Sequence, residues 1–161
     1  MPVTYEPIAT TTVSGSSTSS VSFTGISGSY SDIVFVCEID GSVNDSTRIR
    51  FNGDSGTNYS QTDLRGNGTT ATSTRTTSNA HISLSAGNST NQISVVGSIN
   101  NYSNSTTYKT LILRTNNPTD TVAGRSGLWR NTSAITSIEF SIASGNWVAG
   151  STFTLYGIKA A

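Results

Sequence analysis

Short apolar segments with a period of two dominate the hydrophobic pattern of this chain. In residues 134–142, Ile138, Phe140 and Ile142 occupy every second position, which is typical of a β-strand with one buried face. Residues 32–39 contain an uninterrupted apolar run, which predicts a strand covered on both faces. The chain contains nine segments of these two kinds: residues 20–24, 32–39, 47–51, 59–64, 81–84, 92–99, 108–114, 134–142 and 152–158.

Helix signals are almost absent from the sequence. Apolar stripes of helical spacing are missing, and Ser, Thr and Asn, which are poor helix formers, are abundant. Asn and Gly separate the strand segments, as in Gly66-Asn67-Gly68, and supply the positive φ values that tight turns need. The pattern therefore predicts an all-β fold: a single-domain β-sandwich, jelly-roll-like, with about eight to nine strands.

Two polar segments carry no strand pattern. Residues 10–20 and residues 66–79 consist largely of Ser, Thr, Gly and Asn. We expect both to be surface loops or extended arms, because they have few apolar side chains to bury. The sequence thus predicts an N-terminal arm at residues 1–20, which pairs with a neighbouring copy or another protein by strand addition, and a β-sandwich domain at residues 21–161.

Composition indicates a surface solvated by hydroxyl and amide groups. The 161 residues include 28 Ser and 26 Thr, whereas charged residues make up only 11% and the formal net charge is zero. A neutral chain lacks the electrostatic attraction on which nucleic-acid binding depends. The sequence also lacks an apolar stretch of the roughly 18 residues that a membrane helix requires. We therefore expect neither nucleic acid nor membrane as a partner.

Few residues are suited to catalysis. His81 is the single histidine, so it would have to serve as the base of any Ser-His-Asp triad, and the chain has no G-x-S-x-G motif. The nine acidic residues are scattered through turns and suggest no pair across a cleft. His81 is therefore interpreted as a structural residue at a strand edge. We expect no enzyme activity, no catalytic residue and no cofactor.

One loop has the oxygen-rich composition of a cation site. It contains Asn52 and Asp54, but its sixth position is Thr57, where an EF-hand requires Gly. A β-hairpin turn explains the same residues, so we predict no metal site, and a cation at Asn52–Asp54 stays an open alternative. The single cysteine, Cys37, lies in an apolar run and is interpreted as a buried hydrophobic residue.

Two tryptophans and a tyrosine lie in otherwise polar segments. They are Trp129, Trp147 and Tyr59, and Arg130 follows the first of them. Exposed aromatic rings beside polar groups could stack on sugars or form the centre of a protein interface. The alternative is that each tryptophan closes one end of the sandwich. These four residues are the sequence-based candidates for interface or glycan contact.

Three segments resemble one class of protein. They are residues 51–60 (FNGDSGTNYS), residues 126–138 (SGLWRNTSAITSI) and residues 143–160 (ASGNWVAGSTFTLYGIKA). Together they resemble small β-rich virion proteins of tailed bacteriophages, over a stretch from about residue 30 to the C-terminus. Such proteins are capsid decoration proteins or tail-fibre tips. The resemblance implies a part of the virion and transfers no catalytic residue.

The first hypothesis is a capsid decoration (cement) protein that stabilises the phage head. Its copies would form oligomers, with a trimer favoured, and contact the major capsid protein on the outer capsid surface. The alternative is a tail-fibre or spike tip module that binds a host surface glycan through the four candidate residues. Both hypotheses place the protein in the virion.

Overall fold

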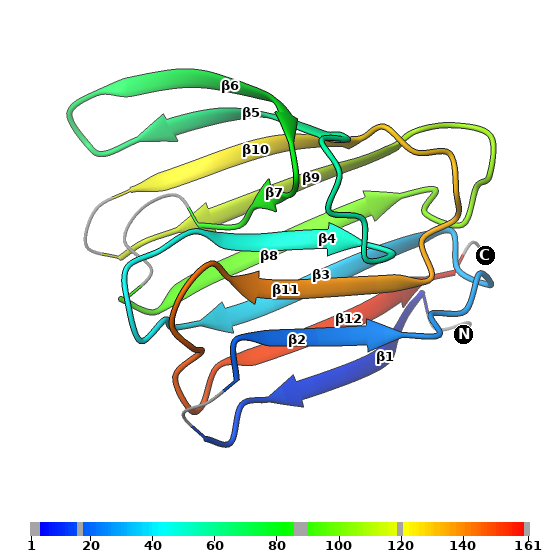
Figure 1. Ribbon diagram of the computed structural model, residues 1–161, viewed down its shortest axis with the longest axis horizontal. Coiled ribbons are helices and arrows are strands. Elements are labelled where there is room, and N and C mark those ends of the chain that lie inside the picture. The colour runs from blue at the N-terminus through cyan, green and yellow to red at the C-terminus, as the bar shows by residue number, and fades with distance from the viewer. Residues whose placement is uncertain (1–3, 16–17, 86–89, 119–120, 160–161) are drawn as a thin grey trace.

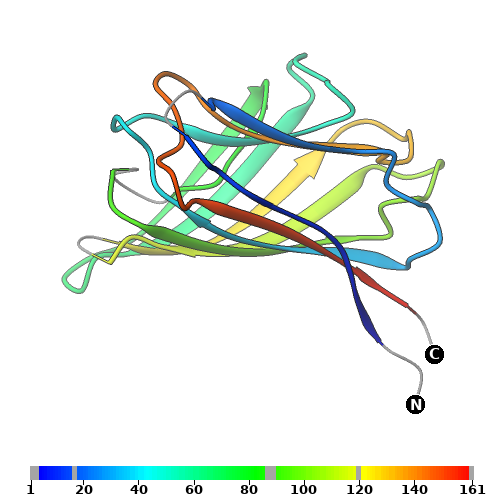
Figure 2. The ribbon, with the colours of Figure 1, turned by 90° about the horizontal axis from the view of Figure 1, so that it is seen from below.

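Two β-sheets packed face to face make up this protein. The computed structural model describes residues 4–15, 18–85, 90–118 and 121–159. These residues form twelve strands and no helix, in an eight-stranded sheet (sheet A) and a four-stranded sheet (sheet B), both antiparallel. Figure 1 looks onto sheet B with sheet A behind it, and Figure 2 shows the two layers from below. The fold is therefore an all-β sandwich in one domain.

Sheet A has the order β1-β12-β3-β8-β9-β10-β5-β6, and sheet B has the order β2-β11-β4-β7. The edges of sheet A are thus β1 and β6, which lie at opposite ends of the sheet in Figure 1. The strands of sheet A are β1 (Tyr5–Thr12), β12 (Thr152–Ile158), β3 (Asp32–Ile39), β8 (Ile93–Asn100), β9 (Lys109–Asn116), β10 (Val122–Trp129), β5 (Tyr59–Gly66) and β6 (Ala71–Asn79). The strands of sheet B are β2 (Ser20–Thr24), β11 (Ser137–Ile142), β4 (Thr47–Phe51) and β7 (Ile82–Ser83).

The core lies between the sheets and is built by alternate residues of each strand. Phe35 of β3 is fully buried and contacts Phe140 of β11, with ring centroids 5.5 Å apart. Gly97 of β8 lies beside this ring, where a Cβ atom would approach Phe35 to 2.2 Å. A larger residue would therefore displace the ring, so the packing itself requires Gly at this position. Burial of such apolar surface is the main source of stability.

All nine segments predicted from the hydrophobic pattern contain strands. Four of these strands, β2, β3, β4 and β12, have the predicted bounds, and β11 begins three residues later than expected. Twelve strands in the described residues exceed the predicted eight to nine. Their division into eight and four also differs from the two balanced sheets of a simple jelly roll.

The three additional strands lack an alternating apolar pattern. The expectation of a loop is wrong for Ala71–Asn79, which forms β6, because pairing with β5 satisfies its backbone without apolar side chains. The expected arm also differs from the structure: Tyr5–Thr12 forms β1 and pairs with β12 of the same chain. Ile8 and Ala9 pack against the core from this strand. Residues 1–3 and 16–17 of that segment lie outside the described residues.

Strand β3 is covered on one face only. Its residues Val34 and Val36 lie on the face of sheet A that points away from sheet B and are half-buried. The prediction that this strand is covered on both faces is therefore wrong for a single chain. Sheet B has four strands and lies on only one side of sheet A. The apolar run nevertheless leaves aliphatic side chains on the outer face of sheet A.

Candidate functional site

The aromatic residues singled out from the sequence lie in the core. Trp129 and Tyr59 are fully buried, and their rings stack with centroids 6.2 Å apart. The Trp129 Nε1 group donates a hydrogen bond of 2.7 Å to the Asp54 carboxylate. Trp147 is also buried, against Phe153 of β12. These three rings are inaccessible to a sugar or a partner, so the structure supports the interpretation in which they close the core.

Arg130 is half-buried and holds a loop. Its Nη2 atom donates a hydrogen bond of 2.8 Å to the carbonyl oxygen of Thr57. Its side chain therefore connects the end of β10 to the loop before β5. None of the four candidate residues thus joins the others in an open binding site.

The loop considered for a cation is closed by protein donors. The Asp54 carboxylate accepts hydrogen bonds from Trp129, from the Asn58 side chain and from the Gly56 backbone. Burial raises the pKa of Asp54, but these hydrogen bonds outweigh it and hold the pKa below its usual value. Since nitrogen donors occupy both carboxylate oxygens, the loop is organised as a turn.

Cys37 is fully buried and His81 is half-buried. Burial together with the charge of Glu38 raises the pKa of the Cys37 thiol. His81 lies just before β7. Burial, followed by the charges of Arg48 and Arg50, lowers the pKa of His81 to about 4. The imidazole is therefore neutral in the folded protein at neutral pH.

Protonation of His81 is expected to weaken the fold. Its pKa is lower in the folded chain than the ~6.5 of an unfolded one, so the stabilisation is complete above ~6.5 and declines as the pH falls toward 4. We expect the free energy of unfolding in urea to fall by roughly 1–2 kcal/mol between about pH 7 and pH 4.5, after allowance for partial exposure. A His81→Gln variant should lose this component of the pH dependence. An unchanged pH profile in that variant would contradict the assignment.

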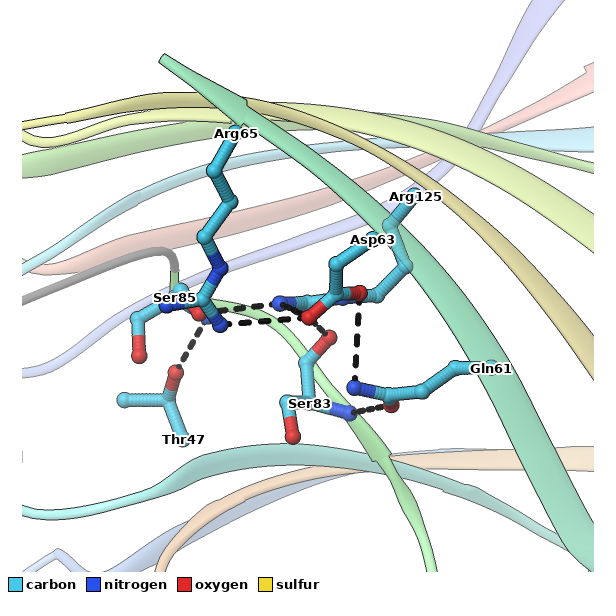
Figure 3. Close-up of polar contacts among 7 residues, drawn as sticks. All are labelled: Thr47, Gln61, Asp63, Arg65, Ser83, Ser85 and Arg125. Atoms are coloured by element: carbon cyan, nitrogen blue, oxygen red, sulfur yellow. Dashed lines mark hydrogen bonds and ion pairs between the residues drawn. The ribbon is translucent and has the colours of Figure 1, made fainter. Parts of the chain in front are cut away.

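A polar cluster lies between the sheets where sheet B ends at β7 (Figure 3). Arg125 of β10 and Asp63 of β5 face each other in the strand register and form a buried ion pair through Nε and Nη2. The same guanidinium group donates to the carbonyl oxygens of Ser83 and Ser85. Arg65 adds a second contact to Asp63, at 3.1 Å.

The cluster fixes β7 against sheet A. Burial raises the pKa of Asp63, but hydrogen bonds and charges from Arg125 and Arg65 outweigh it, so the pKa lies below its usual value. The Gln61 side chain accepts a hydrogen bond from the Ser83 backbone on the same side (Figure 3). Because Arg125 has no exposed side-chain surface, the cluster is a structural element that replaces apolar packing at this end of the core.

No hydrophobic pattern in the sequence indicates that these charged residues are buried, and the same holds for Lys109. This side chain is buried, and its Nζ atom donates hydrogen bonds to the carbonyl oxygens of Thr107 and Thr132. Desolvation lowers the pKa of Lys109. The ammonium group thus connects the loop before β9 to the loop after β10. In the sequence, the only indication of a buried ammonium group is that Lys109 occupies a position of β9 expected to point inward.

The accessible candidate site is the outer face of sheet A, which points away from sheet B. Three large aliphatic residues are prominently exposed there: Leu64 and Ile112 at 63% each, and Val122 at 61%. They come from the neighbouring strands β5, β9 and β10. Exposed aliphatic residues gathered on one face are characteristic of a contact surface.

A groove of about 970 Å³ crosses this outer face from β3 to β6. One row of its lining follows the strand register from Leu64 through Gly124 and Arg114 to Val96. The adjacent row includes Val122 and ends at Glu38 and Ser94, which share a hydrogen bond of 2.5 Å. The groove therefore combines aliphatic side chains with a few hydrogen-bonding groups.

Two glycines, Gly124 and Gly66, line the groove and have free space beside their Cα atoms. A Cβ atom added to Gly124 or Gly66 would meet no heavy atom within 4 Å. The fold therefore accepts a side chain at both positions, in contrast to Gly97. Because Gly124 and Gly66 have no side chain, the backbone of β10 and β5 is accessible to a partner bound in the groove.

Two exposed arginines give this part of the surface a positive charge. Arg114 of β9 lines the groove, and Arg75 projects from β6 beside it. The outward positions of β5, β6, β9 and β10 in the described residues carry no acidic side chain, and the one carboxylate among the groove residues, Glu38, lies at the β3 end and accepts a hydrogen bond from Ser94. The surface is therefore suited to an apolar partner that carries a carboxylate.

The described residues show neither a metal site nor a membrane-spanning helix. They contain no group of three His, Cys, Asp or Glu side chains that could hold a metal ion. No helix in the described part of the chain is long and apolar enough to cross a membrane. Comparison of the sequence with protein-family models gives no match, and comparison with curated proteins gives no match either.

Proposed function

We propose that this chain is a structural protein of a bacteriophage virion, a capsid decoration protein that stabilises the head. The groove and exposed aliphatic residues on the outer face of sheet A carry this proposal, because they form a contact surface without a reactive group at its centre. The charge-poor, hydroxyl-rich composition supports it as well, since such a surface can be buried against a partner without stranding many charges. The resemblance of three sequence segments to phage virion proteins points to the same class.

In this proposal the protein stabilises the capsid by binding to the outer surface of the major capsid protein. The major capsid protein would contribute an apolar segment with a carboxylate that fits the groove and pairs with Arg114. Burial of Leu64 and Val122 would favour attachment by about 25 cal/mol for each Å² of apolar area removed from water. Repeated around the shell, such contacts between copies and capsid subunits would raise the temperature at which the head opens.

Heating of particles that lack the protein tests this proposal. We expect depleted heads to open at a lower temperature, and added wild-type protein to restore the original value. A Gly124→Trp variant should fold normally, because its Cβ meets no atom, yet fill the groove and fail to restore it. Gly15→Trp is the matched control at an equally open position outside the groove and should restore it. Heads that open at the same temperature with and without the protein would overturn the proposal.

The alternative, a fibre tip that binds host glycan, lacks a supporting observation. Its three aromatic candidates, Trp129, Trp147 and Tyr59, are buried in the core. The residues that line the groove include no aromatic side chain on which a sugar ring could stack. The contact surface on sheet A therefore favours the decoration protein.

A further inference from the structure

Strand β6 is an edge strand that is exposed on both of its faces. Its first eight residues, from Ala71 to Ser78, are all exposed, because sheet B does not extend beneath them. They are mostly Thr and Ser, of which the β-branched Thr favours extended backbone, and Arg75 is the only charged residue among them. Pairing with β5 is regular from Ala71 to Thr76. A regular edge of this length is a template for another strand.

The register shows which backbone groups of β6 are available. The Asn67 N–H donates to the Thr70 carbonyl, which makes this pair the hydrogen-bonded one that closes the turn. Hydrogen-bonded and non-hydrogen-bonded pairs alternate along an antiparallel ladder. Ala71, Ser73 and Arg75 therefore direct their N–H and C=O groups away from β5, toward the open edge. Thr74, between them, directs its own groups to Asp63 of β5.

The opposite edge of sheet A is protected. Strand β1 contains Pro7, and its register is interrupted between Pro7 and Ala9. The Lys159 N–H donates to the Thr4 carbonyl, which places Pro7 at a position whose backbone points outward. Proline and an irregular register are two devices by which proteins prevent strand addition. Strand β6 also has a register shift, but only after Thr76, and it contains no proline. The same sheet thus has one edge blocked by proline and one edge that is regular from Ala71 to Thr76.

We propose that β6 pairs antiparallel with β6 of a second copy of this chain about a two-fold axis. A register centred on Thr74 overlaps residues 71–77 and sets the outward groups of Ser73 opposite those of Arg75 in the second copy, whereas a register centred on Arg75 would set the two arginines directly opposite each other. In the register centred on Thr74 the two arginines face serines and not each other, so like charges are not directly opposed. The contact joins two eight-stranded sheets into one continuous sheet and continues the outer face from copy to copy.

This pairing predicts a dimer, whereas the sequence favours a trimer. A closed ring built by sheet extension would require β6 to pair with β1 of the next copy, and Pro7 blocks that edge. A two-fold contact needs only the open edge, which both copies present. The inference deepens the proposed function by naming how copies join, and it rests on that function only in assuming that the protein works as an assembly. Its test uses the isolated protein and is independent of any particle.

Light scattering after gel filtration measures the mass directly. We expect the wild-type protein to have twice the chain mass of 16.8 kDa. Ser73→Pro removes an outward N–H without breaking the ladder to β5 and should yield single chains. Thr10→Pro is the matched control: it lies at an outward position of β1, and the variant should keep the double mass. A wild-type mass of one or three chains, or a Ser73→Pro variant that keeps the double mass, would overturn the inference.

A cysteine variant tests the register without a proline. In the proposed pairing Thr74 faces Thr74 of the second copy as a non-hydrogen-bonded pair, with Cα atoms about 4.5 Å apart, which is within the range for a disulfide. Thr74→Cys should therefore yield a covalent dimer under mild oxidation. Thr76→Cys, displaced from its counterpart, should not, and the native Cys37 is buried and does not interfere. Absence of the Thr74→Cys dimer, or equal yields from both variants, would contradict the pairing.

Discussion

Replacement of Asp63 by Ala is expected to destabilise the fold by about 3–5 kcal/mol, because it leaves a buried arginine without its counter-charge. The Arg125 side chain has no exposed surface, and Asp63 supplies both of its carboxylate contacts. The loss should appear as a lower midpoint in guanidinium chloride, followed by the fluorescence of the buried Trp129 and Trp147.

Two further variants separate this ion pair from an ordinary surface charge. Glu139→Ala removes the more exposed pair between Glu139 and Arg50, at 3.6 Å, and should cost no more than about 1 kcal/mol. The double variant Asp63→Leu/Arg125→Met removes both buried charges and should recover much of the stability lost in Asp63→Ala. If Asp63→Ala costs no more than Glu139→Ala, the buried cluster does not hold β7 as we describe.

Replacement of Trp129 by Ala is expected to destabilise the fold by about 3–5 kcal/mol. The ring is fully buried and packs on Phe51, with centroids 5.5 Å apart, as well as on Tyr59. Trp129→Phe keeps part of this packing but loses the hydrogen bond to Asp54, so we expect a smaller loss of about 1–3 kcal/mol. Chemical unfolding of the purified variants measures both effects.

An exposed aromatic residue provides the control for Trp129. Tyr108 is 54% exposed in the loop before β9, so Tyr108→Ala should change stability by no more than about 0.5 kcal/mol. If Trp129→Ala were as stable as Tyr108→Ala, Trp129 would be a surface residue. It would then again be available for contact with a glycan.

The sequence predicted most of the strands because their side chains repeat every second position over a buried face. The pattern failed at β10, where the inward positions hold Ala123, Arg125, Gly127 and Trp129. Gly127 fits there because Ile82 and Leu111 fill the space beside it, with Ile82 only 2.7 Å from an added Cβ atom. Such compensation between distant strands leaves no local periodicity.

The candidate site could be inferred from the sequence only in part. The apolar run in β3 signalled that both faces of the sheet carry aliphatic residues, and Val34 and Val36 do lie on the outer face. The groove itself depends on the register that places Leu64, Gly124 and Arg114 side by side across three strands. Leu64 and Arg114 are 50 positions apart, so no local pattern could reveal their proximity.

The open edge of β6 has a similar explanation. A polar, Thr-rich segment has no apolar pattern, and its strand forms because β5 supplies the matching backbone. The sequence predicts strand addition at the N-terminal segment, whereas we propose it at β6. Strand β1 instead completes the sheet of its own chain.

The number of copies in each purified particle tests the central claim most directly. Quantitative mass spectrometry against a known shell protein would provide it. A decoration protein repeats with the symmetry of the shell, so the account predicts a copy number that scales with that of the major capsid protein. A handful of copies, as expected for a fibre or spike, or absence from purified particles, would contradict it.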